Sequence, residues 1–281
     1  MEQTEQTQLT YAEKNRKAVI LFLIIVISIS AIVETVTIIT GIMAFVALMM
    51  WAPALAAFIA KQKYFKGEKG VLLFKKCKWK YIGLGLLYPL IYLGLPYVIY
   101  WIANPGTLQM GNATVPFLVV SALIGIPISL ITALGEEIGW RGFLVPRMVQ
   151  WLGLEKTLLI TGLIWSLWHC PLLISGMYMP GTPVWYKVPV FVILIGTSSA
   201  IFSILTLRCK SVWPAALMHA AHNDFDQTIF APITTGDNKM FWVSETGLVT
   251  LAVVIVLTAW VYLSYKKSLQ AQIQQDEAQS A

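Results

Sequence analysis

Three short motifs place polar, mostly ionisable side chains inside long apolar stretches of this chain. GEEIGWRG, residues 135–142, follows an almost unbroken apolar run and carries two adjacent carboxylates and an arginine. WSLWHC carries His169, and HAAHN carries His219 and Asn223. An ionisable side chain in the apolar core of a membrane costs about 2.5–3.5 kcal/mol on insertion scales. These residues are therefore expected either to pair with one another or to do chemistry.

If the first motif is helical, Glu137 can pair with Arg141 while Glu136 has no partner within the motif. Glu137 and Arg141 are four residues apart, so they share a helix face and can form a salt bridge. Glu136 is rotated by about 100° from Glu137 and need not share that partner. Gly135 and Gly139 form a Gly-x-x-x-Gly pattern, which would let another helix approach closely. We expect the salt bridge to be structural and Glu136 to be available for another role.

The two histidine motifs are open to both structural and chemical interpretations. His169 stands alone in the middle of an apolar segment. A histidine there is either a hydrogen-bonded structural residue of the core or part of a functional site. His219 and Asn223 are four apart and share one helix face, and His222 lies next to that face. The sharing of a face suggests that these groups act together.

Depth in the membrane connects the three motifs. At about 1.5 Å per helical residue, Glu136 lies about 16 Å from the basic end of its segment at Arg147. On the same basis His169 lies about 20 Å from Lys156, and His219 about 14 Å from Lys210. Unrelated structural residues would not be expected to agree in depth. The three segments are therefore predicted to bring a carboxylate and two imidazoles together.

Side chains of these types can hydrolyse an amide bond with activated water. A carboxylate can take a proton from water, and a neutral histidine can orient that water or bind a metal. A second histidine and an asparagine amide can donate hydrogen bonds to an oxyanion. Neither Gly-x-Ser-x-Gly nor His-Glu-x-x-His occurs, which excludes the usual serine-hydrolase elbow and the ordinary zincin site.

The elements that must position these groups are membrane helices. The chain is 57% hydrophobic and only 12% charged, whereas soluble domains are about 25% charged. We expect an all-α, polytopic membrane bundle with no soluble domain. The predicted organisation is a disordered cytoplasmic N-terminus at 1–17, a transmembrane domain at 18–265 and a cytoplasmic tail at 266–281, of which 270–281 is expected to be disordered. The eight predicted spans are 18–39, 41–60, 81–102, 116–148, 157–176, 188–207, 212–231 and 246–265.

The distribution of Lys and Arg orients the bundle. With the N-terminus inside, every Lys and Arg except Lys187 and Lys239 falls in an inside segment, as the positive-inside rule predicts. Both termini are therefore expected in the cytoplasm. The Lys-rich segment 61–80 could also attract anionic lipid, although an ordinary topology signal is favoured. The net charge of +6 does not indicate nucleic-acid binding, because the basic residues lie between membrane segments.

The remaining polar and cysteine residues carry weaker signals. The three cysteines have no C-x-x-C spacing and predict no disulfide framework or thiolate zinc site. Cys170 follows His169 and could be a ligand, but a buried apolar role is favoured. Glu34 is intramembrane without a matching motif, so a packing or water-contact role is expected. Asp224 and Asp226 are predicted to be solvated near the outer side.

The motifs resemble those of the CAAX-protease and bacteriocin-processing (CPBP, or Abi) intramembrane proteases, also called type II CAAX prenyl endopeptidases. That family has Glu-Glu-x-x-x-Arg, Phe-x-x-x-His and His-x-x-x-Asn on separate membrane helices. Here the three read EEIGWR (136–141), WSLWH (165–169) and HAAHN (219–223). Trp165 replaces the usual phenylalanine but stays aromatic, so it bears on local packing more than on the histidine. Each motif is weak alone, and the ordered set of three is specific.

The resemblance implies a role for each motif residue. Glu136 would be the water-activating base and His169 its partner, while His219 and Asn223 would stabilise the oxyanion. The family is commonly called a metalloprotease, so Glu136, His169 and His219 could instead bind zinc with water as the fourth ligand. The metal-free arrangement is slightly favoured, because Asn223 shares a face with His219, which suits two hydrogen-bond donors.

The resemblance further implies an endopeptidase that cuts near the C-terminus of a peptide or protein, from the cytoplasmic side. Glu137 and Arg141 would be supporting residues. Lipidated proteins and bacteriocin precursors are the substrate types that the family suggests, with membrane lipid as the surroundings. Two alternatives stay open: a proton-coupled transporter, and a non-catalytic membrane immunity or scaffold protein. No internal repeat of the kind that transporters often show is visible, and a scaffold would not need the complete motif set.

Overall fold

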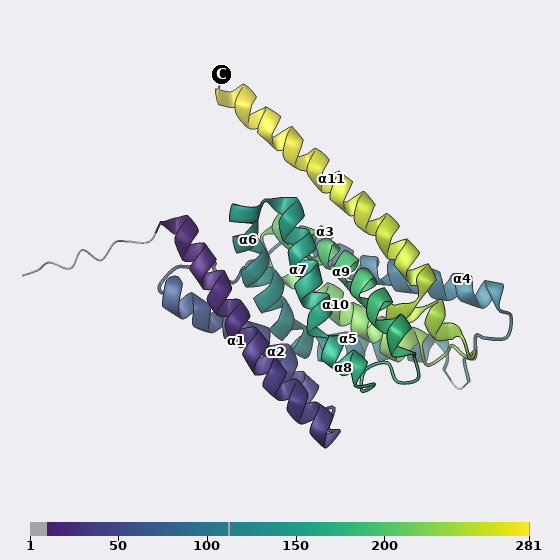
Figure 1. Ribbon diagram of the computed structural model, residues 1–281. Helices are drawn as coiled ribbons and strands as arrows, with labels where there is room; N and C mark the ends of the chain where they lie inside the picture. The colour runs from purple at the N-terminus through teal and green to yellow at the C-terminus, as the bar shows by residue number, and fades with distance from the viewer. Residues whose placement is uncertain (1–9, 112, 281) are drawn as a thin grey trace, which may run out of the picture.

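The computed structural model describes residues 10–111 and 113–280, and their regular elements are helices (Figure 1). The predicted all-α, polytopic membrane bundle is confirmed. The long helices are α1 (Tyr11–Thr40), α2 (Phe45–Tyr64), α5 (Val115–Gly139), α9 (Val184–Cys209) and α11 (Leu248–Ser280). The shorter α-helices are α3 (Trp79–Pro89), α4 (Leu95–Ala103), α6 (Val145–Leu152), α7 (Leu154–Trp168), α8 (Cys170–Ile174) and α10 (Trp213–Asp224). Three π-helical segments, η1 (Leu90–Gly94), η2 (Trp140–Leu144) and η3 (Phe225–Phe230), follow α3, α5 and α10. Two short 3₁₀ turns, η4 (Lys239–Phe241) and η5 (Ser244–Thr246), precede α11.

The structure corrects the predicted number of continuous spans. Within the described ranges, six helices are long and apolar enough to cross a membrane, with α3–α4 and α5–α6 each continuous through a π-helical turn. The predicted span at 157–176 is broken at His169, between α7 and α8, because Pro171 lacks an N–H and clashes with the carbonyl four residues earlier. The predicted span at 212–231 is too polar, because it carries two histidines, an asparagine and two aspartates.

The polar helix α10 avoids lipid because other helices enclose it. It packs against α3, α5 and α9, and nearly all of its side chains are buried. Asp224 and Asp226 were predicted to be solvated but are only 1% and 4% exposed, since α10 and η3 lie inside the bundle. Asp226 accepts hydrogen bonds from Tyr97 and Ser244. The enclosed position is what allows α10 to carry site residues at membrane depth.

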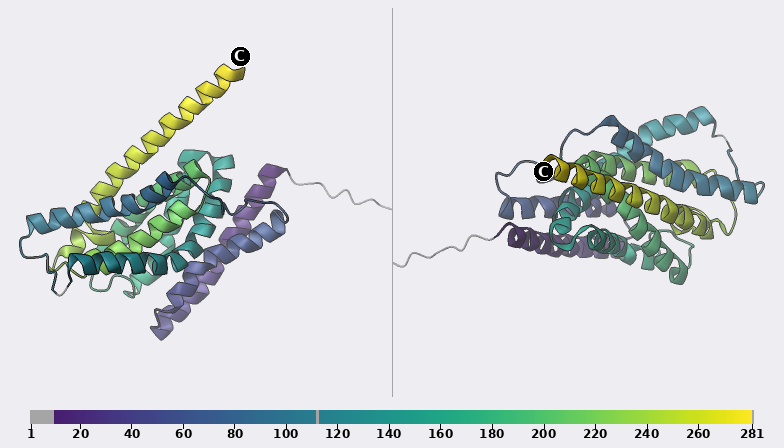
Figure 2. Two further views of the ribbon diagram at one scale, coloured as in Figure 1. Left: turned by 180° about the vertical axis from the view of Figure 1, so that it is seen from behind. Right: turned by 90° about the horizontal axis from the view of Figure 1, so that it is seen from above.

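The flanks of the bundle are formed by different helices. α1 and α2 form an antiparallel pair at one side, and α11 lies at another (Figure 2). Gly135 and Gly139 of α5 face α2, as their spacing predicts. A Cβ atom added at Gly135 would lie 2.7 Å from the Met50 carbonyl oxygen, and one at Gly139 would lie 2.4 Å from the Pro53 Cβ. This close approach brings α2 against the helix that carries Glu136.

Both chain ends are more helical than predicted. α1 begins at Tyr11, because Thr10 and Glu13 form a capping box that satisfies the first backbone N–H groups. The predicted disorder at 1–17 is therefore wrong for residues 11–17, and residues 1–9 lie outside the described part. α11 continues to Ser280 through most of the predicted tail at 266–281. Polar helix-forming residues in that tail extend a helix that the membrane segment has already nucleated.

Candidate active site

The four principal site residues predicted from the sequence line one cavity. Glu136 comes from α5, His169 from the break between α7 and α8, and His219 and Asn223 from α10. The cavity has a volume of about 290 Å³. Its apolar lining includes Met43, Val46, Met49, Met50, Leu172, Phe191 and Ile195. Segments separated by more than eighty positions in the sequence thus present a carboxylate, two imidazoles and an amide to the same space.

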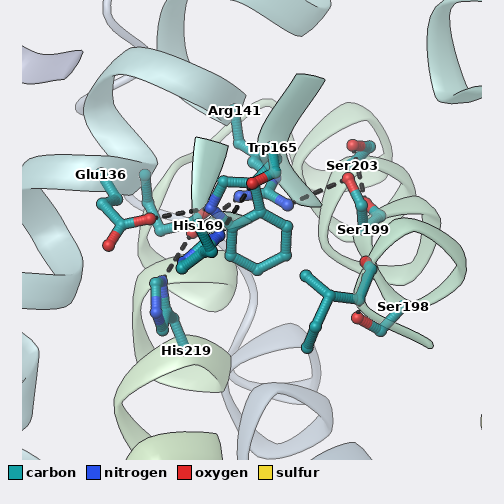
Figure 3. A network of polar contacts seen from close by, with 10 residues as sticks. Glu136, Arg141, Trp165, His169, Ser198, Ser199, Ser203 and His219 are labelled. Carbon is teal, nitrogen blue, oxygen red and sulfur yellow. Dashed lines mark hydrogen bonds and ion pairs between the residues drawn. The ribbon is translucent and has the colours of Figure 1, made fainter. Parts of the chain in front are cut away.

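Glu136 is held by a residue that the sequence analysis treated only as packing. The Trp165 indole Nε1–H donates to Glu136 Oε2 at 2.8 Å (Figure 3). Glu136 is 1% exposed and has no salt bridge within the described residues. One carboxylate oxygen is therefore fixed by the indole while the group faces the cavity. A phenylalanine, which has no N–H, could not make this contact.

His169 is oriented as a proton acceptor. Its Nδ1 lies 2.8 Å from the Trp165 carbonyl oxygen. A carbonyl only accepts hydrogen bonds, so Nδ1 carries the proton and Nε2 of the neutral ring is left unprotonated. Pro171, two residues further on, interrupts the helix, which places the imidazole at a helix end rather than on a continuous face. The arrangement suits a ring that receives a proton or orients water.

Glu137 joins the predicted salt bridge to the second histidine. Arg141 Nη1 and His219 Nδ1 each lie 2.9 Å from Glu137 Oε1. The predicted Glu137–Arg141 pair is thus confirmed, and its helix is also linked to α10. Arg141 additionally donates to Ser199 on α9 at 3.0 Å, and its guanidinium carbon lies 3.9 Å from the centre of the Trp165 ring. The buried arginine therefore joins three helices around the site.

The hydrogen bond to Glu137 restricts what His219 can do. With Nδ1 donating to the carboxylate, a neutral ring leaves Nε2 as an acceptor, whereas the imidazolium presents an Nε2–H donor. Stabilisation of an oxyanion by His219 therefore requires the protonated ring. The Glu137 carboxylate is placed to balance that charge. His169 and His219 consequently have different chemical characters although both are histidines.

Asn223 and His222 complete the polar lining in contrasting ways. The Asn223 amide is half-buried and makes no side-chain hydrogen bond in the described residues, so it is free toward the cavity. His222 is bonded on both nitrogens, to Tyr92 at 2.8 Å and to Glu245 at 2.7 Å. Burial opposes ionisation of Glu245, but the hydrogen bond and charge of His222 outweigh it and lower the pKa of this carboxyl. Sequence reasoning noted His222 only as a neighbour and did not find Glu245.

Two of the three residues that could bind zinc, Glu136 and His219, are held by other side chains in the structure. No group of three or more His, Cys, Asp or Glu side chains in residues 10–111 and 113–280 is arranged to hold a metal ion. Glu136 is engaged by the Trp165 indole, and His219 by Glu137. Cys170 is buried, bonds through Sγ to the Ser166 carbonyl and does not line the cavity.

The fold and cavity define an integral, multi-pass helical membrane protein with a buried Glu/His/His/Asn site. Residues 117–225 match the family model described as Type II CAAX prenyl endopeptidase Rce1-like. "CAAX prenyl protease 2" of Methanococcus maripaludis (strain DSM 14266) is 28% identical over 132 residues. That match covers 46% of this chain and 46% of the relative, so the chain spans about half the length of this curated relative. The resemblance predicted from the three motifs is confirmed over a segment that contains all four cavity-lining site residues.

Proposed function

We propose that this protein is an intramembrane endopeptidase that hydrolyses a peptide bond near the C-terminus of a peptide or protein. The observation that carries the proposal is the convergence of Glu136, His169, His219 and Asn223 on one cavity. These groups supply a base, a water-orienting ring and two donors, which is what amide hydrolysis by water requires. The relative's name, CAAX prenyl protease 2, supports the same class of reaction.

The proposed reaction begins with a water molecule between Glu136 and His169. The Glu136 carboxylate takes one proton as the water oxygen attacks the carbonyl carbon, and His169 Nε2 accepts the other water hydrogen in a hydrogen bond. The carbonyl oxygen becomes an oxyanion that accepts from the His219 imidazolium and the Asn223 amide. The carbon–nitrogen bond then breaks, and Glu136 returns its proton to the leaving amine. Atoms and charge balance without a covalent enzyme intermediate.

The substrate class follows from the resemblance and from the cavity. Methionine and other apolar side chains form much of the lining and suit apolar residues next to the cut bond. A substrate carrying a lipid, or a bacteriocin precursor, would reach this site from the membrane. We propose membrane-associated peptides or proteins as substrates and cleavage from the cytoplasmic side.

Loss of the base should abolish turnover without unfolding the protein. We expect Glu136→Gln to lower kcat by at least about 10²-fold, because general-base catalysis contributes that much or more. Cleavage of peptide libraries with varied C-termini by the purified protein in detergent measures this. Glu68→Gln is the matched control, since Glu68 is an exposed carboxylate paired with Lys14. Near-normal turnover by Glu136→Gln would refute the assignment.

The role of a metal is decided by a separate experiment. The proposed reaction routes no step through a metal, so exhaustive chelation should leave kcat within about twofold of the untreated value. Metal analysis of the active protein accompanies the assay. Stoichiometric zinc that is lost and restored together with activity would replace the metal-free mechanism by one in which Glu136, His169 and His219 hold the ion.

A further inference from the structure

Two histidines of α10 are each held by a carboxylate from a different element. His219 Nδ1 lies 2.9 Å from Glu137 on α5, and His222 Nε2 lies 2.7 Å from Glu245 on η5, just before α11. The first contact belongs to the site already described. The second has no part in the proposed reaction, although His222 and Glu245 both line the cavity.

The surroundings of His222 fix the ring completely. Glu245 Oε1 accepts from His222 Nε2, and Glu245 Oε2 accepts from the Tyr178 hydroxyl. The Tyr92 hydroxyl lies 2.8 Å from His222 Nδ1 and donates to it when the ring is neutral. His222 and Glu245 are 5% and 4% exposed, and Tyr92 is fully buried. The ring cannot turn without leaving buried polar groups unpaired, which costs about 1–3 kcal/mol for each group.

Glu245 is itself tied to the bundle. The preceding residue, Ser244, donates to Asp226 at 2.5 Å, and Asp226 also accepts from Tyr97 at 2.9 Å. Asp226 on η3, which Tyr97 of α4 also contacts, therefore holds η5 in place. Tyr178, in the segment after α8, also holds Glu245, so the bond from His222 to Glu245 ties α10 to a segment outside that helix.

A restraint on α10 would fix the direction of the Asn223 side-chain amide. Asn223 directly follows His222, and its side chain has no hydrogen-bond partner of its own in the described ranges. The direction of its amide therefore depends on the rotation and position of the α10 backbone. A small turn of α10 about its axis would move the amide away from the oxyanion, and a misplacement of 1 Å can cost about 10²-fold in rate.

We propose that Glu245 is a positioning residue, which acts through His222 to hold α10 so that the Asn223 amide faces the reacting carbonyl. Tyr92 completes the restraint from the opposite ring nitrogen. Because it assigns a role within peptide-bond hydrolysis, this inference rests on the proposed function. It also explains why a buried carboxylate outside the three sequence motifs lines the cavity.

The test is a double-mutant cycle with kcat and KM measured separately. We expect Glu245→Gln to lower kcat by about tenfold with KM nearly unchanged, because the amide cannot accept from both His222 and Tyr178. Asn223→Ala removes the donor and should lower kcat by about 10²–10³-fold. In the Asn223→Ala background, Glu245→Gln should cost less than twofold, because the group that it positions is gone.

A milder pair of variants covers the case in which Glu245→Gln folds poorly. Tyr92→Phe removes only the hydroxyl that donates to His222 and should show the same loss of kcat and the same non-additivity. Tyr262→Phe is the control, since it removes a tyrosine hydroxyl that bonds to a carboxylate, Glu155, away from the cavity, and it should keep kcat within about twofold of the wild type. Equal losses in the wild-type and Asn223→Ala backgrounds, or a change confined to KM, would overturn the inference alone. Absence of cleavage of any peptide by the wild type would overturn the proposed function and this inference with it.

Discussion

At the scale of single residues, the site depends on a balance of buried charge around Glu137. This carboxylate is fully buried and receives both Arg141 and His219 through the same oxygen. The guanidinium also stacks on Trp165, which in turn fixes Glu136. Arg141 therefore supports the site by neutralising one glutamate and by packing against the residue that holds the other.

Removal of Arg141 should damage folding more than chemistry. We expect Arg141→Ala to destabilise the protein by about 3–5 kcal/mol, because it leaves Glu137 buried without its guanidinium partner. Thermal unfolding in detergent, together with the yield of folded protein, measures the effect. Arg16→Ala is the matched control, since Arg16 is exposed on α1 and should have almost no effect. Unchanged thermal stability of Arg141→Ala would show that the salt bridge is not structural.

The side-chain contacts of the site could be predicted from the sequence only where both residues lie on one helix. The Glu137–Arg141 pair follows from four-residue spacing, and both residues lie on one continuous helix. The bond from Trp165 to Glu136 and that from His222 to Glu245 join different elements. No local pattern encodes them. Trp165 did give a signal, because it stands where the family pattern has phenylalanine, but the sequence does not show where its N–H points.

At the scale of elements, glycines set how closely the helices around the cavity pack. Gly139 faces Pro53 on α2, and Gly162 of α7 faces the carbonyl of Gly196 on α9. α2 and α5 both line the cavity, so their separation determines its width. The Gly-x-x-x-Gly pattern predicted a close approach to α5, and only the structure identifies α2 as the partner. The break at His169 was missed, because hydropathy alone favoured one continuous span.

A methyl group at Gly139 should force α2 away from α5. A Cβ there would lie 2.4–2.6 Å from Pro53 atoms, including its backbone, so we expect Gly139→Ala to destabilise by about 1–3 kcal/mol. Gly83→Ala is the matched control, because a Cβ at this exposed helical position meets nothing within 4 Å. That variant should be neutral or more stable by up to about 1 kcal/mol. Equal unfolding temperatures for the two variants would contradict the packing argument.

At the scale of the whole molecule, the distribution of Lys and Arg predicts one orientation of the bundle. The start of α1 and the end of α11 lie toward the same end of the bundle (Figures 1 and 2). Lys187 and Lys239, the two exceptions to the charge bias, have structural partners. Lys187 donates to the carbonyls of Tyr178 and Met179, and Lys239 donates to carbonyls in the turn after η3. They hold loops together, so the bias in the remaining basic residues is the topology signal.

The segment 61–80 and both termini are accordingly predicted to be cytoplasmic. Single cysteines at exposed positions test this in a variant whose native Cys77, Cys170 and Cys209 are replaced by alanine. In intact bacterial cells, an impermeant maleimide should label Asp237→Cys in the turn before α11 and leave Lys69→Cys unlabelled. Lys69→Cys should react only after the cells are permeabilised, because Lys69 is exposed in the structure but on the inner side. Labelling of Lys69→Cys from outside would show that the bundle has the opposite orientation. The cavity would then be approached from the opposite face, so the experiment also tests the proposed side of cleavage.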